Sequence, residues 1–123
     1  MNSNKALIFV IDDDPVIREL VTFNLQVRGY EVMAFSNGMD ALQSIEETRP
    51  DLVILDVIMP DLDGWEMCKI LRDTDETLPI IMLTALDTAR DKLIGRSILR
   101  ADAYVTKPFD IDHLISSVKK LIE

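Results

Sequence analysis

Cysteine, glycine and positive charge are all scarce in this 123-residue chain. The single cysteine cannot form an internal disulfide, which excludes a disulfide scaffold and fits a reducing compartment. No apolar run approaches the roughly 18 residues of a membrane span, and the N-terminus lacks the layout of a signal peptide. We therefore expect a cytoplasmic protein whose residues 1–123 form one domain, long enough to fold without covalent staples.

The charge balance narrows the classes of partner. Thirteen Lys and Arg residues stand against 22 Asp and Glu residues, which gives a formal net charge of −9. Such a surface repels phosphate backbones and anionic lipid headgroups. We expect no direct contact with nucleic acid or membrane.

Apolar runs and amphipathic stretches alternate five times along the chain. We predict strands over residues 6–11, 31–35, 52–56, 80–84 and 103–106, and helices over residues 15–28, 38–48, 64–73, 88–99 and 111–122. Three strand runs are continuously apolar, which is typical of parallel strands buried on both faces. This alternation predicts an α/β fold with a doubly wound, five-stranded parallel sheet of (βα)5 type.

Local signals support several helix boundaries. Asp14 can cap the first helix with Pro15 in its first position, and Gly29 fits just past its end. Cys68 falls within a predicted helix, where we interpret it as a buried residue rather than a reactive thiol. The fourth helix has the weakest signal, because Gly95 interrupts it and its apolar stripe is poorly defined.

Polar side chains follow four of the predicted strands. Asp12 and Asp13 come after the first, Asp56 ends the third, Thr84 ends the fourth and Lys107 follows the fifth. Because parallel strands bring their carboxyl ends to one edge of the sheet, these side chains should meet there. That edge is where open α/β sheets place their binding sites.

Clustered carboxylates raise one another's pKa unless a cation offsets their charge, and Mg²⁺ prefers oxygen ligands. Asp12, Asp13 and Asp56 therefore suggest a Mg²⁺ site, with Asp56 as a nucleophile that can carry a phosphoryl group as an acyl phosphate. The alternative is that residues 12–14 form a solvated turn and a helix cap, which we prefer for Asp14.

The other two groups are ambiguous when taken singly. The Thr84 hydroxyl can donate to a phosphoryl oxygen, but an ordinary strand threonine explains it equally well. Lys107 can bind the same oxygens, and the alternative is a surface lysine. Pro108 favours a positioned side chain, since X–Pro bonds in tight turns are often cis. The evidence for a phosphoryl-transfer site is the occurrence of all these groups together at the ends of the strands.

With these motifs the chain resembles the receiver domains of two-component response regulators, of the chemotaxis-regulator type, over nearly its whole length. The matching segments are Val10-Ile11-Asp12-Asp13-Asp14, Leu55-Asp56 through Asp63-Gly64, Leu83-Thr84-Ala85 and Tyr104-Val105-Thr106-Lys107-Pro108-Phe109. The resemblance implies a flavodoxin-like sheet of strand order 2-1-3-4-5. It also implies a signalling switch with slow autodephosphorylation and no turnover of small molecules.

The resemblance assigns roles to individual residues. Asp56 would accept a phosphoryl group from a sensor histidine kinase or a phosphotransfer protein. Mg²⁺ would be held by Asp12, Asp13 and Asp56, together with the backbone carbonyl of Ile58.

The remaining roles concern the response to phosphorylation. Lys107 would bind the phosphoryl oxygens. Thr84 and Tyr104 would form the switch pair, with Tyr104 rotating inward and altering the surface of the fourth helix, fifth strand and fifth helix. An output protein or effector domain, whose identity the sequence does not give, would read this surface.

The chain departs from its relatives on that surface. The spacing from Thr84 to Lys107 is one residue longer than usual, and Arg100-Ala101-Asp102-Ala103 stands where many relatives have Gly-Ala-Asp directly before the aromatic residue. His113 and Ser117 occupy positions where winged-helix relatives carry a Glu and an Arg that pair across a dimer. We expect a monomer or weak dimer, and we interpret His113 as an exposed surface residue.

Three alternative functions fit the sequence less well. A haloacid-dehalogenase-type phosphatase needs a second Asp two positions after its nucleophile, where this chain has Ile58. A flavodoxin-like cofactor binder needs a first loop rich in Ser, Thr or Gly, and three aspartates would repel its phosphate. A receiver relative that only binds partners would have lost a site residue. The sequence ends with the last helix, at Glu123, which fits either a stand-alone regulator or a fragment of a longer chain.

Overall fold

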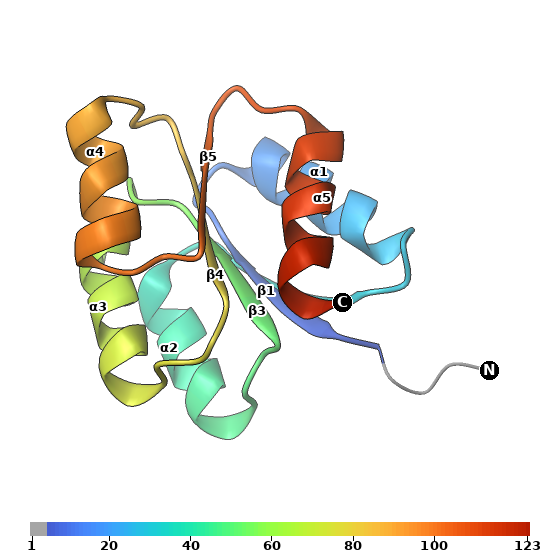
Figure 1. The fold of residues 1–123 in the computed structure, drawn as a ribbon. Helices are drawn as coiled ribbons and strands as arrows, with labels where there is room; N and C mark the ends of the chain where they lie inside the picture. Colours follow the sequence, from blue (N-terminus) through green and yellow to red (C-terminus); the bar gives the residue numbers. More distant parts are fainter. Residues whose placement is uncertain (1–4) are drawn as a thin grey trace.

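The structure, a computed structural model, describes residues 5–123 and alternates strands with helices (Figure 1). The strands are β1 (Leu7–Ile11), β2 (Glu31–Phe35), β3 (Leu52–Leu55), β4 (Ile80–Thr84) and β5 (Ala103–Thr106). The helices are α1 (Pro15–Gln26), α2 (Gly38–Glu47), α3 (Gly64–Thr74), α4 (Ala89–Leu93), η1 (Ile94–Ile98) and α5 (Ile111–Ile122).

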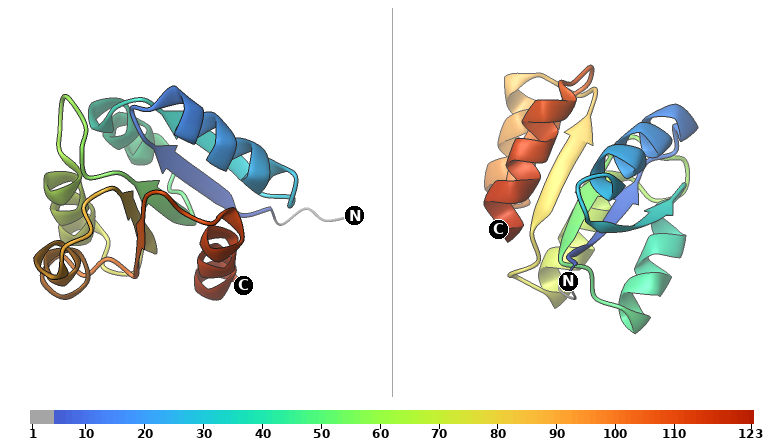
Figure 2. Two further views of the ribbon diagram at one scale, coloured as in Figure 1. Left: turned by 90° about the horizontal axis from the view of Figure 1, so that it is seen from above. Right: turned by 90° about the vertical axis from the view of Figure 1, so that its right-hand side faces the viewer.

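The five strands form one parallel sheet in the order β2-β1-β3-β4-β5. Helices α1 and α5 cover one face, while α2, α3 and α4 lie on the other (Figure 1 and the left view of Figure 2). The predicted doubly wound fold and strand order are confirmed.

Burial explains which strands lie in the centre of the sheet. Nearly every residue of β1, β3 and β4 is buried. In the edge strands, β2 has only exposed and half-buried residues, and β5 is half-buried except for the buried Val105. Two buried clusters, one on each face, form the core. Continuous apolar runs thus correctly predicted the central strands. The first strand begins one residue later than predicted, and the third ends at Leu55, so Asp56 lies in the loop.

The local helix signals are also confirmed. Asp14 caps α1 by accepting hydrogen bonds from the backbone N–H groups of Val16 and Ile17. Gly29 has a φ of +93°, a conformation that glycine adopts without strain. Cys68 is buried in α3, where desolvation raises the pKa of its thiol to about 11.

The fourth helix differs from the single regular helix that we predicted over residues 88–99. Helix α4 passes directly into the π-helical segment η1, closed by a hydrogen bond of 2.8 Å from the Leu99 N–H to the Ile94 carbonyl. A π turn spans one residue more than an α turn, so it accommodates one additional residue without lengthening the segment. A helix is therefore present over most of the predicted range, but its second half has π rather than α hydrogen bonding.

Candidate functional site

Strand register brings the polar side chains to one edge of the sheet. Ile11 at the end of β1 pairs with Leu55 at the end of β3, so Asp12 and Asp56 leave the sheet at the same level. Thr84 pairs with Thr106, and Lys107 follows directly. The structure thus brings together the strand-end residues that the sequence singled out.

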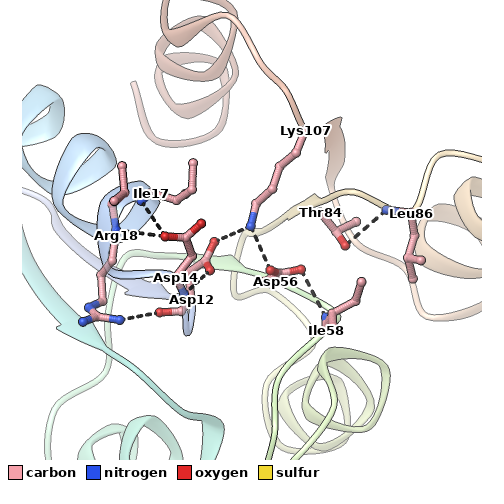
Figure 3. Close-up of polar contacts among 10 residues, drawn as sticks. Asp12, Asp14, Ile17, Arg18, Asp56, Ile58, Thr84, Leu86 and Lys107 are labelled. Carbon is pink, nitrogen blue, oxygen red and sulfur yellow. Dashed lines mark hydrogen bonds and ion pairs between the residues drawn. The ribbon is translucent and has the colours of Figure 1, made fainter.

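Lys107 joins the two buried carboxylates (Figure 3). Its Nζ lies 2.7 Å from Asp12 Oδ2 and 2.8 Å from Asp56 Oδ2. The residues lie 95 and 51 positions apart in the sequence. Asp12 and Asp56 are only 3% and 5% exposed, so water screens these contacts weakly. The peptide bond between Lys107 and Pro108 is cis, as the sequence suggested.

The pKa shifts report how burial and pairing compete in this site. Burial raises the pKa of Asp12 above its ordinary value, although the hydrogen bond from Lys107 opposes the rise. Burial alone would lower the pKa of Lys107, but hydrogen bonds to Asp12 and Asp56 outweigh it and raise that pKa. The ammonium form of Lys107 is therefore stabilised at neutral pH.

Asp13 completes an acidic cluster. Carboxylate oxygens of Asp12, Asp13 and Asp56 all lie within 4.8 Å of one another. When ionised, three carboxylates against the one Lys107 ammonium leave a local charge of −2. Oxygen donors with this unbalanced charge fit a hard divalent cation such as Mg²⁺. The exposed Asp13 gives such an ion access from solvent.

The loop after Asp56 folds back on the carboxyl edge of the sheet. The Ile58 N–H donates to Asp56 Oδ1 at 3.1 Å, and the Gly64 N–H donates to the Val57 carbonyl at 2.8 Å. The Asp56–Val57 backbone approaches so closely that a Cβ atom at position 64 would lie 2.3 Å from the Asp56 carbonyl oxygen. Only glycine fits there, which the sequence pattern alone did not reveal.

Thr84 and Tyr104 meet at the backbone of Leu86. The Leu86 N–H donates to Thr84 Oγ1 at 3.4 Å (Figure 3). The Leu86 carbonyl accepts from the Tyr104 hydroxyl at 2.6 Å. Burial, followed by the charges of nearby aspartates, raises the pKa of Tyr104 to about 12, so its hydroxyl remains a neutral donor. The Tyr104 ring already packs against the core and against Gly95. The inward rotation implied by the resemblance therefore does not start from an exposed ring in this structure.

Sequence reasoning missed several residues that support the site. Arg18 donates to the Asp12 carbonyl at 2.8 Å, and Leu86 connects Thr84 to Tyr104. Gly64 lies against the Asp56–Val57 backbone, and Gly95 lies against the Tyr104 ring. The backbone role of Leu86 has no sequence signal. The Asp63-Gly64 pair at a helix start could have suggested a tight turn.

A family model of the response regulator receiver domain matches residues 8–119. The alkaline phosphatase synthesis transcriptional regulatory protein PhoP of Bacillus subtilis is 44% identical over 115 residues, which cover 94% of this chain and 48% of that protein. The chain thus spans about half the length of this relative.

Solved structures agree with the match. The receiver domain of a Francisella response regulator has a TM-score of 0.91 and 35% identity, covering 96% of this chain and 97% of that one. The response regulator TrrA of Thermotoga maritima, solved in complex with Mg(2+)-BeF, has a TM-score of 0.85 and 41% identity, covering 94% and 98%. None of the helices within residues 5–123 is long and apolar enough to span a bilayer.

Proposed function

Since the chain belongs to the family of response regulator receiver domains, we propose that residues 1–123 form a phosphoacceptor switch in which Asp56 carries the phosphoryl group. The supporting observation is the pairing of two buried carboxylates with one lysine at the carboxyl edge of the sheet. Asp56 is the member of this pair that directly follows the central strand β3, between Lys107 on one side and the 57–63 loop on the other.

The contacts of Asp56 suit nucleophilic attack. Its carboxylate is held from both sides, by Lys107 at Oδ2 and by the Ile58 N–H at Oδ1. An Asp56 oxygen attacks phosphorus in a phosphohistidine, a P–O bond forms, and the P–N bond breaks. The histidine nitrogen leaves with the bonding pair and takes a proton from solvent. Lys107 then lies within reach of the transferred oxygens and offsets their charge.

Mg²⁺ fits the donor set of Asp12, Asp13, Asp56 and the Ile58 carbonyl. When bound, it supplies charge neutralisation for the phosphoryl oxygens. The protein contributes the preformed arrangement of carboxylates, held by Lys107 and by the Asp14 N–H that donates to Asp12 Oδ1 at 2.9 Å.

The switch proposal follows from the contacts of Thr84. A phosphoryl group on Asp56 offers new acceptors, and the Thr84 hydroxyl donates to one of them. The Thr84–Leu86–Tyr104 chain of hydrogen bonds then stabilises the packed ring of Tyr104. The phosphoryl group can shift this equilibrium only by its differential interaction with the two arrangements. The surface affected is that of α4, η1, β5 and α5, where an output partner binds.

Helix α1 offers a face for the phosphodonor protein, a histidine kinase or phosphotransfer protein. Val16, Leu20, Phe23 and Val27 are 71%, 44%, 63% and 60% exposed. Their spacing places them on one side of the helix. This apolar stripe begins next to the acidic pocket, since α1 starts directly after Asp14. An apolar helix face of this kind suits packing against a helical partner.

The pocket lacks what a phosphatase of small molecules requires. The residue two positions after Asp56 is Ile58, which is 54% exposed and supplies no acid or base. Hydrolysis of the acyl phosphate therefore depends on an unassisted water molecule. We propose slow autodephosphorylation rather than catalytic turnover.

The test is labelling with acetyl phosphate in the presence of Mg²⁺. Intact mass rises by one phosphoryl group in the wild type, and hydroxylamine removes the label, as expected of an acyl phosphate. Asp56→Asn retains the size of the side chain but not its nucleophile, so it remains unlabelled. Equal labelling of Asp56→Asn and wild type would show that the phosphoacceptor is another residue.

A further inference from the structure

Asp61 makes contacts that the proposed phosphoacceptor chemistry does not explain. Its Oδ1 accepts from the Gly38 N–H at 3.2 Å, and its Oδ2 accepts from the Met39 N–H at 3.1 Å. Both donors belong to the first turn of α2 and lie more than 20 positions earlier in the chain. A single carboxylate thus joins the loop that follows Asp56 to the start of another helix.

Helix α2 already has its own cap. The Asn37 side chain accepts from the Asp40 N–H at 2.9 Å, as a helix-capping residue normally does. Asp61 satisfies the N–H groups of Gly38 and Met39. Gly38 is buried, whereas Met39 is exposed and its N–H could otherwise bond to solvent. The second contact, from Asp61 Oδ2 to the exposed Met39 N–H, therefore exceeds what the stability of this helix end requires.

The loop of residues 57–63 is held at both ends and in its second half. The Val57–Gly64 hydrogen bond closes its base, and the Ile58 N–H bonds to Asp56. Leu62 packs on Gly38, where a Cβ atom would lie 3.3 Å from the Leu62 side chain. Asp61 supplies the polar part of this contact, three positions after Ile58.

We infer that Asp61 is a positioning residue for the cation site: by tying the 57–63 loop to the first turn of α2, it orients the Ile58 carbonyl toward Asp12, Asp13 and Asp56. This inference rests on the proposed function, in which that carbonyl is a Mg²⁺ ligand. Residues that orient metal ligands commonly change metal affinity without touching the ion.

The experiment measures the rate of acetyl-phosphate labelling as a function of Mg²⁺ concentration. In Asp61→Ala, the Mg²⁺ concentration for half-maximal rate should rise roughly tenfold, the lower end of the range for residues that orient metal ligands. The rate at saturating Mg²⁺ should return to the wild-type value, because Asp56 and Lys107 are unchanged. Asp61→Asn retains one acceptor oxygen, so its half-maximal Mg²⁺ concentration should lie between those of the wild type and Asp61→Ala.

Asn37→Ala is the matched control. It removes a cap from the same helix end, but Asn37 has no hydrogen bond to the 57–63 loop. Its half-maximal Mg²⁺ concentration should remain that of the wild type. If Asp61→Ala matches the wild type, or shifts only as much as Asn37→Ala, Asp61 is merely a helix cap and the inference is wrong. If the wild type is not labelled at all, the proposed function fails first and the inference fails with it.

Discussion

Two glycines, Gly64 at the start of α3 and Gly95 in η1, each leave room for a different kind of neighbour. A Cβ atom at Gly64, beside the acidic pocket, would lie 2.3 Å from the Asp56 carbonyl oxygen and 2.5 Å from the Val57 Cα. A Cβ atom at Gly95, in η1, would lie 2.8 Å from two ring carbons of Tyr104. The first neighbour is backbone that directly follows β3, and the second is a side chain that can rotate.

The difference separates a rigid region from an adaptable one. The pocket lies at the ends of buried central strands, and its carboxylates are held by hydrogen bonds from several elements. The α4–η1 segment has only Gly95 buried, and its helix changes hydrogen-bond pattern after five residues. Substitutions at the pocket should therefore change the stability and the chemistry of the protein. Substitutions in α4–η1 should mainly change how side chains are arranged.

Gly64→Ala should have the largest effect. The added methyl group meets backbone atoms that cannot move without displacing Asp56, so we expect a loss of about 3 kcal/mol or more in unfolding free energy. Urea denaturation measures it. Gly29→Ala is the control, since its φ of +93° is strained for alanine but its surroundings are open, and it should lose only about 1 kcal/mol. Similar losses in the two variants would mean that the pocket backbone is adaptable.

Removal of Mg²⁺ should have the next largest effect. Cation binding at about 100 times the dissociation constant would stabilise the wild type by about 2.7 kcal/mol, because it relieves repulsion among the carboxylates. Asp13→Ala should abolish this gain and raise the stability of the metal-free protein. The adjacent Asp14→Ala weakens the cap of α1 but should retain the response to Mg²⁺. Thermal unfolding with and without Mg²⁺ measures both, and a wild type insensitive to Mg²⁺ would contradict the site.

Gly95→Ala should leave stability within about 1 kcal/mol of wild type. Alanine favours a helical backbone by about that amount, which offsets the contact with Tyr104. The Tyr104 ring should nevertheless be displaced from its position against residue 95, and its hydroxyl should no longer donate to the Leu86 carbonyl. By NMR, a beryllofluoride phosphate mimic should still shift pocket resonances but no longer those of Tyr104. Ser97→Ala, an exposed change in the same segment, should respond as the wild type does. Persistent Tyr104 shifts in Gly95→Ala would show that the ring does not need this position.

Arg100→Gly should have the smallest effect, and it should be stabilising. Arg100 has a φ of +62°, in the left-handed region that disfavours residues with a Cβ atom. Glycine relieves this strain but gains freedom in the unfolded chain, which leaves a net gain of about 0.5 kcal/mol. The exposed pair with Glu76, at 3.8 Å, contributes little. Arg96→Gly makes the same change of charge within η1 and should instead lose about 1 kcal/mol. Calorimetric melting shows whether Arg100→Gly raises or lowers the stability of the folded protein.

The predictability of each region follows from the range of the forces that shape it. Continuous apolar runs such as Leu52–Leu55 predict central strands, because a strand buried on both faces requires apolar side chains at consecutive positions. The π turn of η1 was not predicted, because the apolar stripe around Gly95 is too poorly defined to distinguish one type of helix from another. Likewise, the resemblance placed Tyr104 in the switch, but not the position its ring adopts against Gly95.

The sequence by itself determined how strands and helices alternate along the chain, the cap at Asp14 and the polar groups at the strand ends. Each of these features depends on residues within a few positions of one another. Only the tertiary structure decided which of those groups touch. Lys107 reaches Asp12 across 95 positions, and Asp61 reaches Gly38 across 23. Such contacts depend on how the whole sheet and its helices pack, because loop closure and burial, rather than local preference, determine which distant atoms become neighbours.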